Sequence, residues 1–113
     1  MYTVFHNPRC TKSREALALL QEKGCEVEVI EYLKMVPTEE SLKLVLMKLN
    51  MKPEQLVRKG EDVFKQKLKG LKLSDQEWIK VLVEHPILIE RPIVIKGNKA
   101  VIARPSSNIE LLG

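Results

Sequence analysis

The chain has 113 residues, 44% of them hydrophobic and 30% charged, which suits a single domain over residues 1–113 whose core needs no disulfide or metal staple. A net charge of +4 and few aromatic side chains argue against direct nucleic-acid binding, and no apolar run approaches the ~20 residues that a membrane span requires. Two cysteines without C-x-x-C spacing exclude a secreted disulfide scaffold and a zinc site of that type, so we expect a soluble, cytoplasmic protein with free thiols.

The first third of the chain predicts a β-α-β unit. Residues 2–6 indicate a strand that ends at Asn7-Pro8, residues 11–23 a helix that stops at Gly24, and residues 25–32 a second strand. The two strands of such a unit are parallel and are joined by a right-handed crossover.

The middle of the chain predicts helices. One begins at residues 37–40, a short helical piece follows over residues 53–60, and a third helix begins with the capping box of residues 74–77 and ends at His85-Pro86. Between the last two, the lysine-rich residues 65–72 indicate a loop or a frayed helix with a solvated face.

The last part of the chain predicts a β-hairpin from residues 93–95 and 100–102, turning at Gly97-Asn98, and a final helical turn capped by Ser106 or Ser107. The predicted fold class is therefore α/β, with a four-stranded mixed sheet built from β-α-β, a helical insert, a β-hairpin and a C-terminal helix. No repeat, linker or second domain is indicated.

Cys10 stands where the first predicted strand gives way to a helix, a favourable place to activate a thiol. Unpaired N–H groups and the positive end of the helix dipole stabilise an anion there, and Arg9, Lys12 and Arg14 add positive charge. Lowering a thiol pKa of about 8.5 by roughly two units needs about 2.7 kcal/mol, within reach of a helix terminus and a nearby cation. The polar surroundings favour a reactive thiol over a small apolar filler.

The second cysteine has a different environment. Cys25 opens the second strand, at the opposite end of the sheet from Cys10, so we expect it to pack as a small hydrophobe. Ser13 occupies the position where a dithiol enzyme has its second cysteine. We therefore expect no internal disulfide, and an oxidised Cys10 would need an external thiol to reduce it.

Four segments together carry a family pattern. They are His6-Asn7-Pro8-Arg9-Cys10 with Ser13-Arg14, Leu56-Val57-Arg58-Lys59, the stretch from His85-Pro86-Ile87-Leu88-Ile89 to Glu90-Arg91-Pro92-Ile93-Val94, and Arg104-Pro105-Ser106. In their order and spacing they resemble the glutaredoxin-coupled arsenate reductases, the ArsC family, in its short form. The resemblance covers nearly the whole chain and implies a thioredoxin-like fold with one catalytic cysteine.

The resemblance also implies a role for each matched residue. The nucleophile is Cys10 and its thiolate is supported by His6; the oxyanion ligands are Arg58, Arg91 and Arg104; Asn7, Ser13 and Pro92 are supporting residues, Pro92 as the cis-proline before the third strand. Without the resemblance, His6 would be interpreted as a structural histidine and each arginine as a surface charge. The peptide bond before Pro92 would be expected trans, because only ~5–6% of X–Pro bonds are cis.

Electrostatics makes a set of arginines sensible for this chemistry. A thiolate that attacks an arsenate dianion meets roughly 8 kcal/mol of repulsion, at about 4 kcal/mol for each pair of unit charges ~4 Å apart in an effective dielectric near 20. Guanidinium groups are always charged and bind two oxygens at a time, so they offset this repulsion and orient the anion.

The function that the resemblance implies is reduction of arsenate to arsenite. Cys10 attacks arsenate or a related oxyanion, glutathione attacks the adduct as co-substrate, and glutaredoxin resolves the mixed disulfide. No metal, bound cofactor or membrane is expected.

Two alternatives remain open at this point. Thr11-Lys12 stands where family members usually have Gly-Thr, which leaves room for glutathione-dependent reduction of another substrate. A sister branch of the same fold binds RNA polymerase and senses redox state through a Cys-x-x-Cys pair; Ser13 argues against that sensing, though not against polymerase binding.

Overall fold

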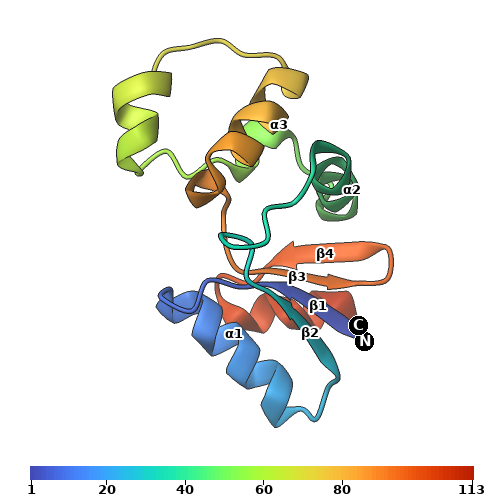
Figure 1. Ribbon diagram of the computed structural model, residues 1–113. Helices are drawn as coiled ribbons and strands as arrows, with labels where there is room; N and C mark the ends of the chain where they lie inside the picture. The colour runs from blue at the N-terminus through green and yellow to red at the C-terminus, as the bar shows by residue number, and fades with distance from the viewer. The chain divides into compact units, whose positions relative to one another are not determined.

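The chain is organised as two compact units in a computed structural model that describes residues 1–113 (Figure 1). The first unit combines Met1–Met35 with Arg91–Gly113, and the second is Val36–Glu90. The second unit is therefore an insertion between the two segments that form the first.

The first unit is built on a four-stranded sheet. Its strands are β1 (Tyr2–Phe5), β2 (Val27–Ile30), β3 (Ile93–Lys96) and β4 (Lys99–Ile102), in the spatial order β2-β1-β3-β4. The β1–β2 pair is parallel, and β3 runs antiparallel to both β1 and β4. The predicted mixed sheet, with its parallel β-α-β unit and its hairpin, is confirmed.

Helix α1 (Thr11–Glu22) connects β1 to β2 and buries one face in the core of this unit. Its buried residues Ser13, Ala16 and Leu20 recur at helical spacing, and Ala16 and Leu20 pack with Val4 and Val94 of the sheet. The helix ends before Gly24, whose φ of +71° is one that a residue with a side chain rarely adopts.

The C-terminal segment completes the first unit but differs from the prediction. Residues Ser106–Leu112 form a 3-10 helix, and the predicted serine cap is wrong, because Pro105 is the capping residue and makes no side-chain cap. Ile109 and Leu112 are buried in the same core as Val4 and Val94.

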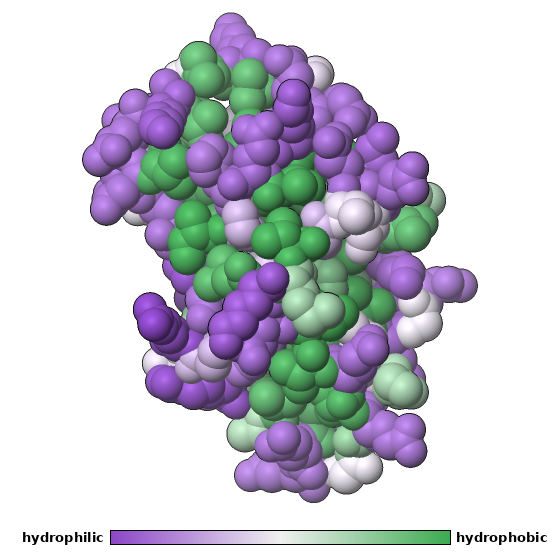
Figure 2. Space-filling model, in the orientation of Figure 1, coloured by the Kyte–Doolittle hydropathy of each residue, from purple (hydrophilic) through white to green (hydrophobic).

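Apolar side chains also reach the surface of the first unit over α1 and β2 (Figure 2). Val29 of the edge strand β2 is 43% exposed.

The second unit is helical. It contains α2 (Glu39–Leu49), α3 (Asp75–Glu84) and two short 3-10 helices, Pro53–Leu56 and Pro86–Leu88. The predicted capping box of α3 is confirmed, since Ser74 Oγ accepts the Glu77 N–H at 3.2 Å and the Glu77 carboxylate accepts the Ser74 N–H at 3.0 Å. His85 ends this helix, as predicted.

Two predictions for this unit need correction. The helical piece after Pro53 ends at Leu56, because Val57 is extended and forms an antiparallel bridge with Ile89. Residues Phe64–Leu68 are a π-helical turn rather than a loop or a frayed helix. Its lysines are exposed as expected, but Phe64 and Leu68 are buried, and the Phe64 ring stacks on Trp78 at a centroid distance of 6.4 Å.

The length and polarity of the helices decide whether any of them could span a membrane. None of the helices combines the length and the apolar character that crossing a bilayer would take.

Candidate active site

Cys10 is the N-capping residue of α1. Its backbone is extended (φ −95°, ψ 121°), its N–H donates to the Asn7 carbonyl at 3.0 Å, and its carbonyl accepts the Arg14 N–H at 3.0 Å. The Cys10 side chain is partly exposed. The sulfur therefore stands at the positive end of the helix dipole, as the strand-turn-helix pattern predicts.

A buried hydrogen-bond network holds the loop between β1 and α1, which carries Cys10. Ser13 is fully buried, and its Oγ accepts the Asn7 N–H at 3.0 Å while lying 2.8 Å from His6 Nδ1. The Asn7 side chain accepts the Arg9 N–H at 3.0 Å. Because Ser13 Oγ already accepts from Asn7, its own proton is available for donation to an unprotonated His6 Nδ1.

The protonation of His6 agrees with this arrangement. Burial lowers the pKa of His6 below its ordinary value of 6.5; the Glu31 carboxylate opposes this shift and the Arg14 guanidinium adds to it. His6 is therefore neutral near pH 7 and can accept from Ser13. The structure places its imidazole against Ser13, and support of the Cys10 thiolate by His6 stays a prediction.

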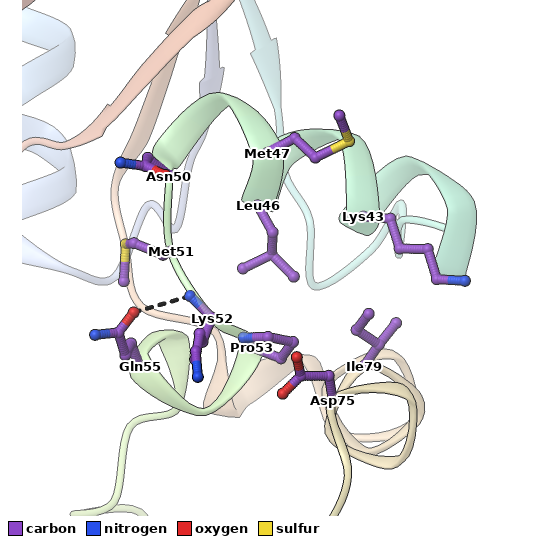
Figure 3. A pocket seen from close by; sticks show the side chains of 10 residues that line it. All are labelled: Lys43, Leu46, Met47, Asn50, Met51, Lys52, Pro53, Gln55, Asp75 and Ile79. Atoms are coloured by element: carbon purple, nitrogen blue, oxygen red, sulfur yellow. Dashed lines mark hydrogen bonds between the residues drawn. The ribbon is translucent and has the colours of Figure 1, made fainter.

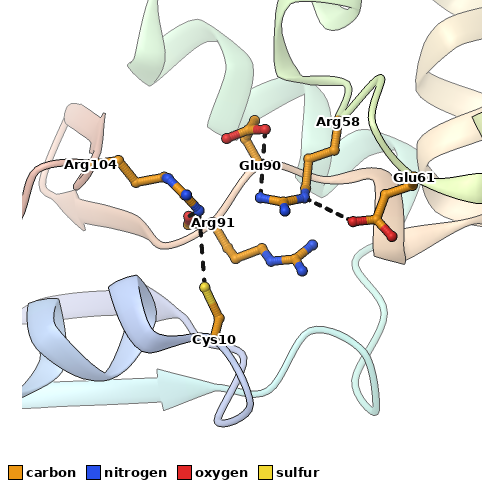
Figure 4. Close-up of polar contacts among 6 residues, drawn as sticks. All are labelled: Cys10, Arg58, Glu61, Glu90, Arg91 and Arg104. Carbon is orange, nitrogen blue, oxygen red and sulfur yellow. Dashed lines mark hydrogen bonds and ion pairs between the residues drawn. The ribbon is translucent and has the colours of Figure 1, made fainter.

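Two arginines lie with Cys10 in the first unit (Figure 4). Arg104 Nη1 is 4.0 Å from Cys10 Sγ and donates to the Arg91 carbonyl at 3.3 Å. The Arg91 residue itself is only 8% exposed. Two of the three arginines that the family resemblance named are thus near the thiol. In the sequence, Arg91 precedes β3 and Arg104 follows β4.

The peptide bond between Arg91 and Pro92 is cis, immediately before β3. The expectation of a trans bond from X–Pro statistics was wrong, whereas the resemblance implied the cis form. A second cis bond joins Arg104 to Pro105 and was not predicted.

The environment of Cys10 lowers its thiol pKa. Burial raises the pKa of Cys10, but this is outweighed by hydrogen bonds to the sulfur from the Ser13 N–H, the Arg91 guanidinium and the Lys12 N–H, together with the Arg91 charge. The net pKa is below the ordinary thiol value, so a larger fraction of Cys10 is thiolate at neutral pH.

Two of the cations near Cys10 in sequence, Lys12 and Arg14, have partners of their own. Lys12 Nζ is 3.8 Å from Glu15, and the Arg14 guanidinium donates to the Pro8 carbonyl at 3.4 Å and to Thr11 Oγ1 at 3.2 Å. We therefore assign the activation of Cys10 to the helix N-terminus and Arg91 rather than to these exposed side chains.

Arg58 belongs to the second unit, where two carboxylates hold it (Figure 4). Arg58 Nε donates to Glu61 Oε2 at 3.2 Å, and its Nη1 is 3.7 Å from Glu90 Oε1. Sequence reasoning missed both glutamates. The i, i+3 spacing from Arg58 to Glu61 was an available signal, but nothing in the sequence pairs Arg58 with Glu90.

A groove of about 790 Å³ also lies in the second unit, between α2, α3 and the 3-10 helix at Pro53 (Figure 3). Its lining is mainly apolar, with Leu46, Met47 and Ile79 among the residues, and contains none of the predicted site residues.

No group of three or more His, Cys, Asp or Glu side chains in the chain could hold a metal ion.

Cys25 packs against the core of the first unit as a partly buried side chain, in agreement with its interpretation as a small hydrophobe. It precedes β2, whose first residue Val27 pairs with Tyr2 at the start of β1, whereas Cys10 follows the end of β1. The two thiols are therefore at opposite ends of the sheet.

A β2-β1-β3-β4 sheet, a thiol at the N-terminus of the first helix and a cis-proline before β3 define a thioredoxin-like thiol protein. Comparison with known proteins narrows this class. The model of the ArsC family matches residues 5–112, and the chain belongs to that family.

Three relatives illustrate the similarity. The chain is 40% identical over 109 residues to "Arsenate reductase" of Neisseria meningitidis, covering 95% of this chain and 93% of that protein. It is 42% identical over 113 residues to "Uncharacterized protein YfgD" of Escherichia coli, covering 97% and 95%. The solved structure of an arsenate reductase from Vibrio cholerae superposes with a TM-score of 0.94 at 37% identity, covering 99% of this chain and 97% of that one.

Proposed function

We propose that this protein is a thiol-dependent oxidoreductase that reduces arsenate to arsenite through an adduct on Cys10. The observation that carries the proposal is the position of the Cys10 sulfur, at the N-terminus of α1 with Arg104 Nη1 at 4.0 Å and with Arg91 lowering its pKa. This arrangement provides a nucleophile and two guanidinium groups for an anionic substrate. Membership of the ArsC family supports arsenate as that substrate.

The proposed first step is attack of the Cys10 thiolate on arsenic. A bond forms between Cys10 Sγ and As(V), and one arsenate oxygen leaves as water after taking up protons from solvent. The repulsion between thiolate and anion is offset by Arg91 and Arg104, whose planar donors bind oxygens in pairs.

The second step is the reduction. A glutathione thiolate attacks Cys10 Sγ in the adduct, the S–As bond breaks, and its electron pair passes to arsenic, which leaves as arsenite, As(III). Cys10 and glutathione are oxidised to a mixed disulfide, and glutaredoxin then restores the Cys10 thiol by disulfide exchange. Ser13, in place of a second cysteine, and Cys25, at the far end of the sheet, support an external reductant.

The remaining assignments follow the family resemblance. Arg58 is the third oxyanion ligand, Pro92 shapes the chain beside the thiol, and the buried contacts of His6, Asn7 and Ser13 keep the Cys10 loop in position. The Ser13 N–H acts on the sulfur directly, so a displacement of the start of α1 would change the thiol pKa.

The decisive experiment follows NADPH consumption in the presence of glutathione, glutathione reductase, glutaredoxin and arsenate. Wild type should show arsenate-dependent turnover and Cys10→Ser none, while Cys25→Ala should retain it. Turnover in Cys10→Ser would refute the mechanism. Absence of turnover in wild type, with Cys10 still rapidly alkylated near pH 7, would leave a reactive thiol whose substrate is not arsenate.

A further inference from the structure

Four of the five arginines in the chain belong to the first unit: Arg9, Arg14, Arg91 and Arg104. Arg91 and Arg104 are assigned above to the thiolate and the oxyanion, and Figure 4 shows the Cys10 sulfur directed toward them from the start of α1. Arg9 and Arg14 have no part in that chemistry. Arg9 directly precedes Cys10, Arg14 follows it by one helical turn, and both are exposed.

The backbone fixes the point from which the Arg9 side chain leaves the chain. The Arg9 N–H donates to Asn7 Oδ1 at 3.0 Å and the Cys10 N–H donates to the Asn7 carbonyl at 3.0 Å, so Arg9 and Cys10 share one tight turn. The Arg9 guanidinium makes no hydrogen bond and no ion pair. Because adjacent Cα atoms are about 3.8 Å apart, this free charge stays near the Cys10 sulfur in every rotamer.

The Arg14 guanidinium lies against the same turn. It donates to the Pro8 carbonyl at 3.4 Å and to Thr11 Oγ1 at 3.2 Å, the residues on either side of Arg9 and Cys10. Both acceptors are neutral, so they leave the positive charge of Arg14 uncompensated. The N–H groups of the guanidinium that these bonds do not use are available to a ligand.

The carboxylates at this end of the first unit are already paired with lysines. Glu15 Oε2 is 3.8 Å from Lys12 Nζ, and Glu31 Oε1 is 3.6 Å from Lys34 Nζ. The other glutamates of the unit are at the end of α1, in or next to β2, and in the C-terminal segment. The turn that carries Cys10 therefore keeps the positive charges of Arg9 and Arg14.

A second anion reaches Cys10 in the proposed reaction, namely the thiol that attacks the arsenic adduct. Glutathione carries two carboxylates and one ammonium group, so it is an anion near pH 7. At that step the oxygens of the adduct occupy Arg91 and Arg104. Arg9 and Arg14 remain free, and a planar guanidinium matches a carboxylate with two parallel N–H bonds.

We propose that Arg9 and Arg14 bind the carboxylates of the reducing thiol, and that they make Cys10 selective for anionic small thiols of the glutathione type over neutral and cationic ones. The proposal rests on the proposed function in one respect, the need for an external thiol. Arg14, tied to Pro8 and Thr11, provides the fixed contact, and Arg9 adapts to the ligand.

The first test compares alkylation of Cys10 by iodoacetate, an anion, and by neutral iodoacetamide, in a Cys25→Ala background. In both reactions the thiolate sulfur bonds to carbon and iodide leaves, so a change in the thiol pKa cancels from the ratio of the two rate constants. Arg9→Gln should lower the iodoacetate-to-iodoacetamide ratio about twofold in low salt, the effect of a unit charge ~8 Å away in water. In about 1 M salt, where the Debye length is about 3 Å, the difference should disappear.

The matched control is Lys99→Gln. Lys99 is an exposed cation of the same unit without an ion pair, and it begins β4 at the end of the sheet away from Cys10. Its removal should leave the ratio unchanged, and Arg9→Lys, which keeps the charge, should preserve most of it. An unchanged ratio in Arg9→Gln, or an equal fall in Lys99→Gln, would overturn the proposal.

The second test measures the reducing thiol itself. Cys10 is converted to its mixed disulfide with 2-thiopyridine; a thiolate that attacks Cys10 Sγ forms a new disulfide and releases 2-thiopyridine, whose absorbance gives the rate. With rates referred to thiolate concentration, Arg9→Gln should slow glutathione about twofold, leave 2-mercaptoethanol unchanged and speed cationic cysteamine. Arg14→Gln should add a similar factor. Equal effects on all three thiols would overturn the proposal.

The two levels of inference fail in different ways. In the arsenate assay Arg9→Gln should raise the KM for glutathione and leave the KM for arsenate unchanged; a rise in the KM for arsenate alone would place Arg9 in the oxyanion site and overturn the proposal. If arsenate is turned over but neither test depends on charge, only the role of Arg9 and Arg14 is refuted. If both tests behave as expected but arsenate is not turned over, that role stands and the proposed substrate is wrong.

Discussion

The Oγ of Ser13 lies 2.8 Å from Nδ1 of His6 and accepts the N–H of Asn7, so one buried hydroxyl joins the end of β1 to the start of α1. Cys10 is in the loop that this hydroxyl closes. The stability of the loop and the pKa of the Cys10 thiol are thus linked through Ser13, a residue that does not itself react.

Ser13→Ala should lower the free energy of unfolding by about 1–3 kcal/mol, because it leaves the Asn7 N–H and His6 Nδ1 buried without their partner. Urea denaturation measures this loss. The matched control is Ser107→Ala, at an exposed serine, which should change stability by less than about 0.5 kcal/mol. Equal effects of the two substitutions would contradict a structural role for the Ser13 hydroxyl.

Arg91→Gln should raise the pKa of Cys10, because it removes a hydrogen bond and a positive charge that stabilise the thiolate. In wild type the pKa is lowered, so alkylation should reach half its maximal rate at a pH below that of an ordinary thiol. The midpoint should move upward in Arg91→Gln and stay nearly unchanged in Lys12→Gln, whose ammonium is paired with Glu15. A midpoint unaffected by Arg91→Gln would assign the activation to the helix terminus alone.

Acidification should cost stability through His6. Its folded-state pKa is lowered from 6.5, so the unfolded chain binds the proton more readily, and the stability contributed by neutral His6 is present above pH 6.5. That contribution is lost as the pH falls from 6.5 through the lowered pKa. Thermal melts between pH 7.5 and 5 should therefore show a larger drop in Tm for wild type than for His6→Asn, and equal drops would argue against this account.

Cys25→Ala should leave turnover and the Cys10 alkylation profile unchanged. The side chain packs on the core of the first unit, so we expect only a modest loss of stability, on the order of 1 kcal/mol. A thiol titration under denaturing conditions should fall from two equivalents to one. A loss of turnover in a folded Cys25→Ala protein would show that the second thiol takes part in the reaction.

The parts of the fold that the sequence predicted well are those set by neighbouring residues. The capping box of Ser74 and Glu77 is a local pattern, and so is the turn at Gly97, whose φ is +59°. The π-helical turn was missed because Phe64 and Leu68, four residues apart, stand among lysines, and because Phe64 packs on Trp78 of another helix, a contact that local sequence does not indicate.

The same distinction applies to the site. The position of Cys10 at a helix N-terminus could be predicted from the order of strand, turn and helix. The pairing of Arg58 with Glu90 could not, because it depends on a bridge between two segments far apart in the chain. The contact of His6 with Ser13 could not be predicted either, because it depends on the directions in which the two side chains point.

The pairing of β1 with β3 has a consequence for synthesis of the protein. Val4 and Val94, which pair across these central strands, are about 90 residues apart in the chain. At ~5–20 residues per second, β1 is synthesised roughly 5–20 s before β3. During that interval β2 can cover only one edge of β1, and the other edge presents unpaired N–H and C=O groups to any extended chain nearby. The nascent protein thus passes through a stage at which its future central strand is an open edge, and correct folding depends on β3 pairing with that edge before a strand of another chain does.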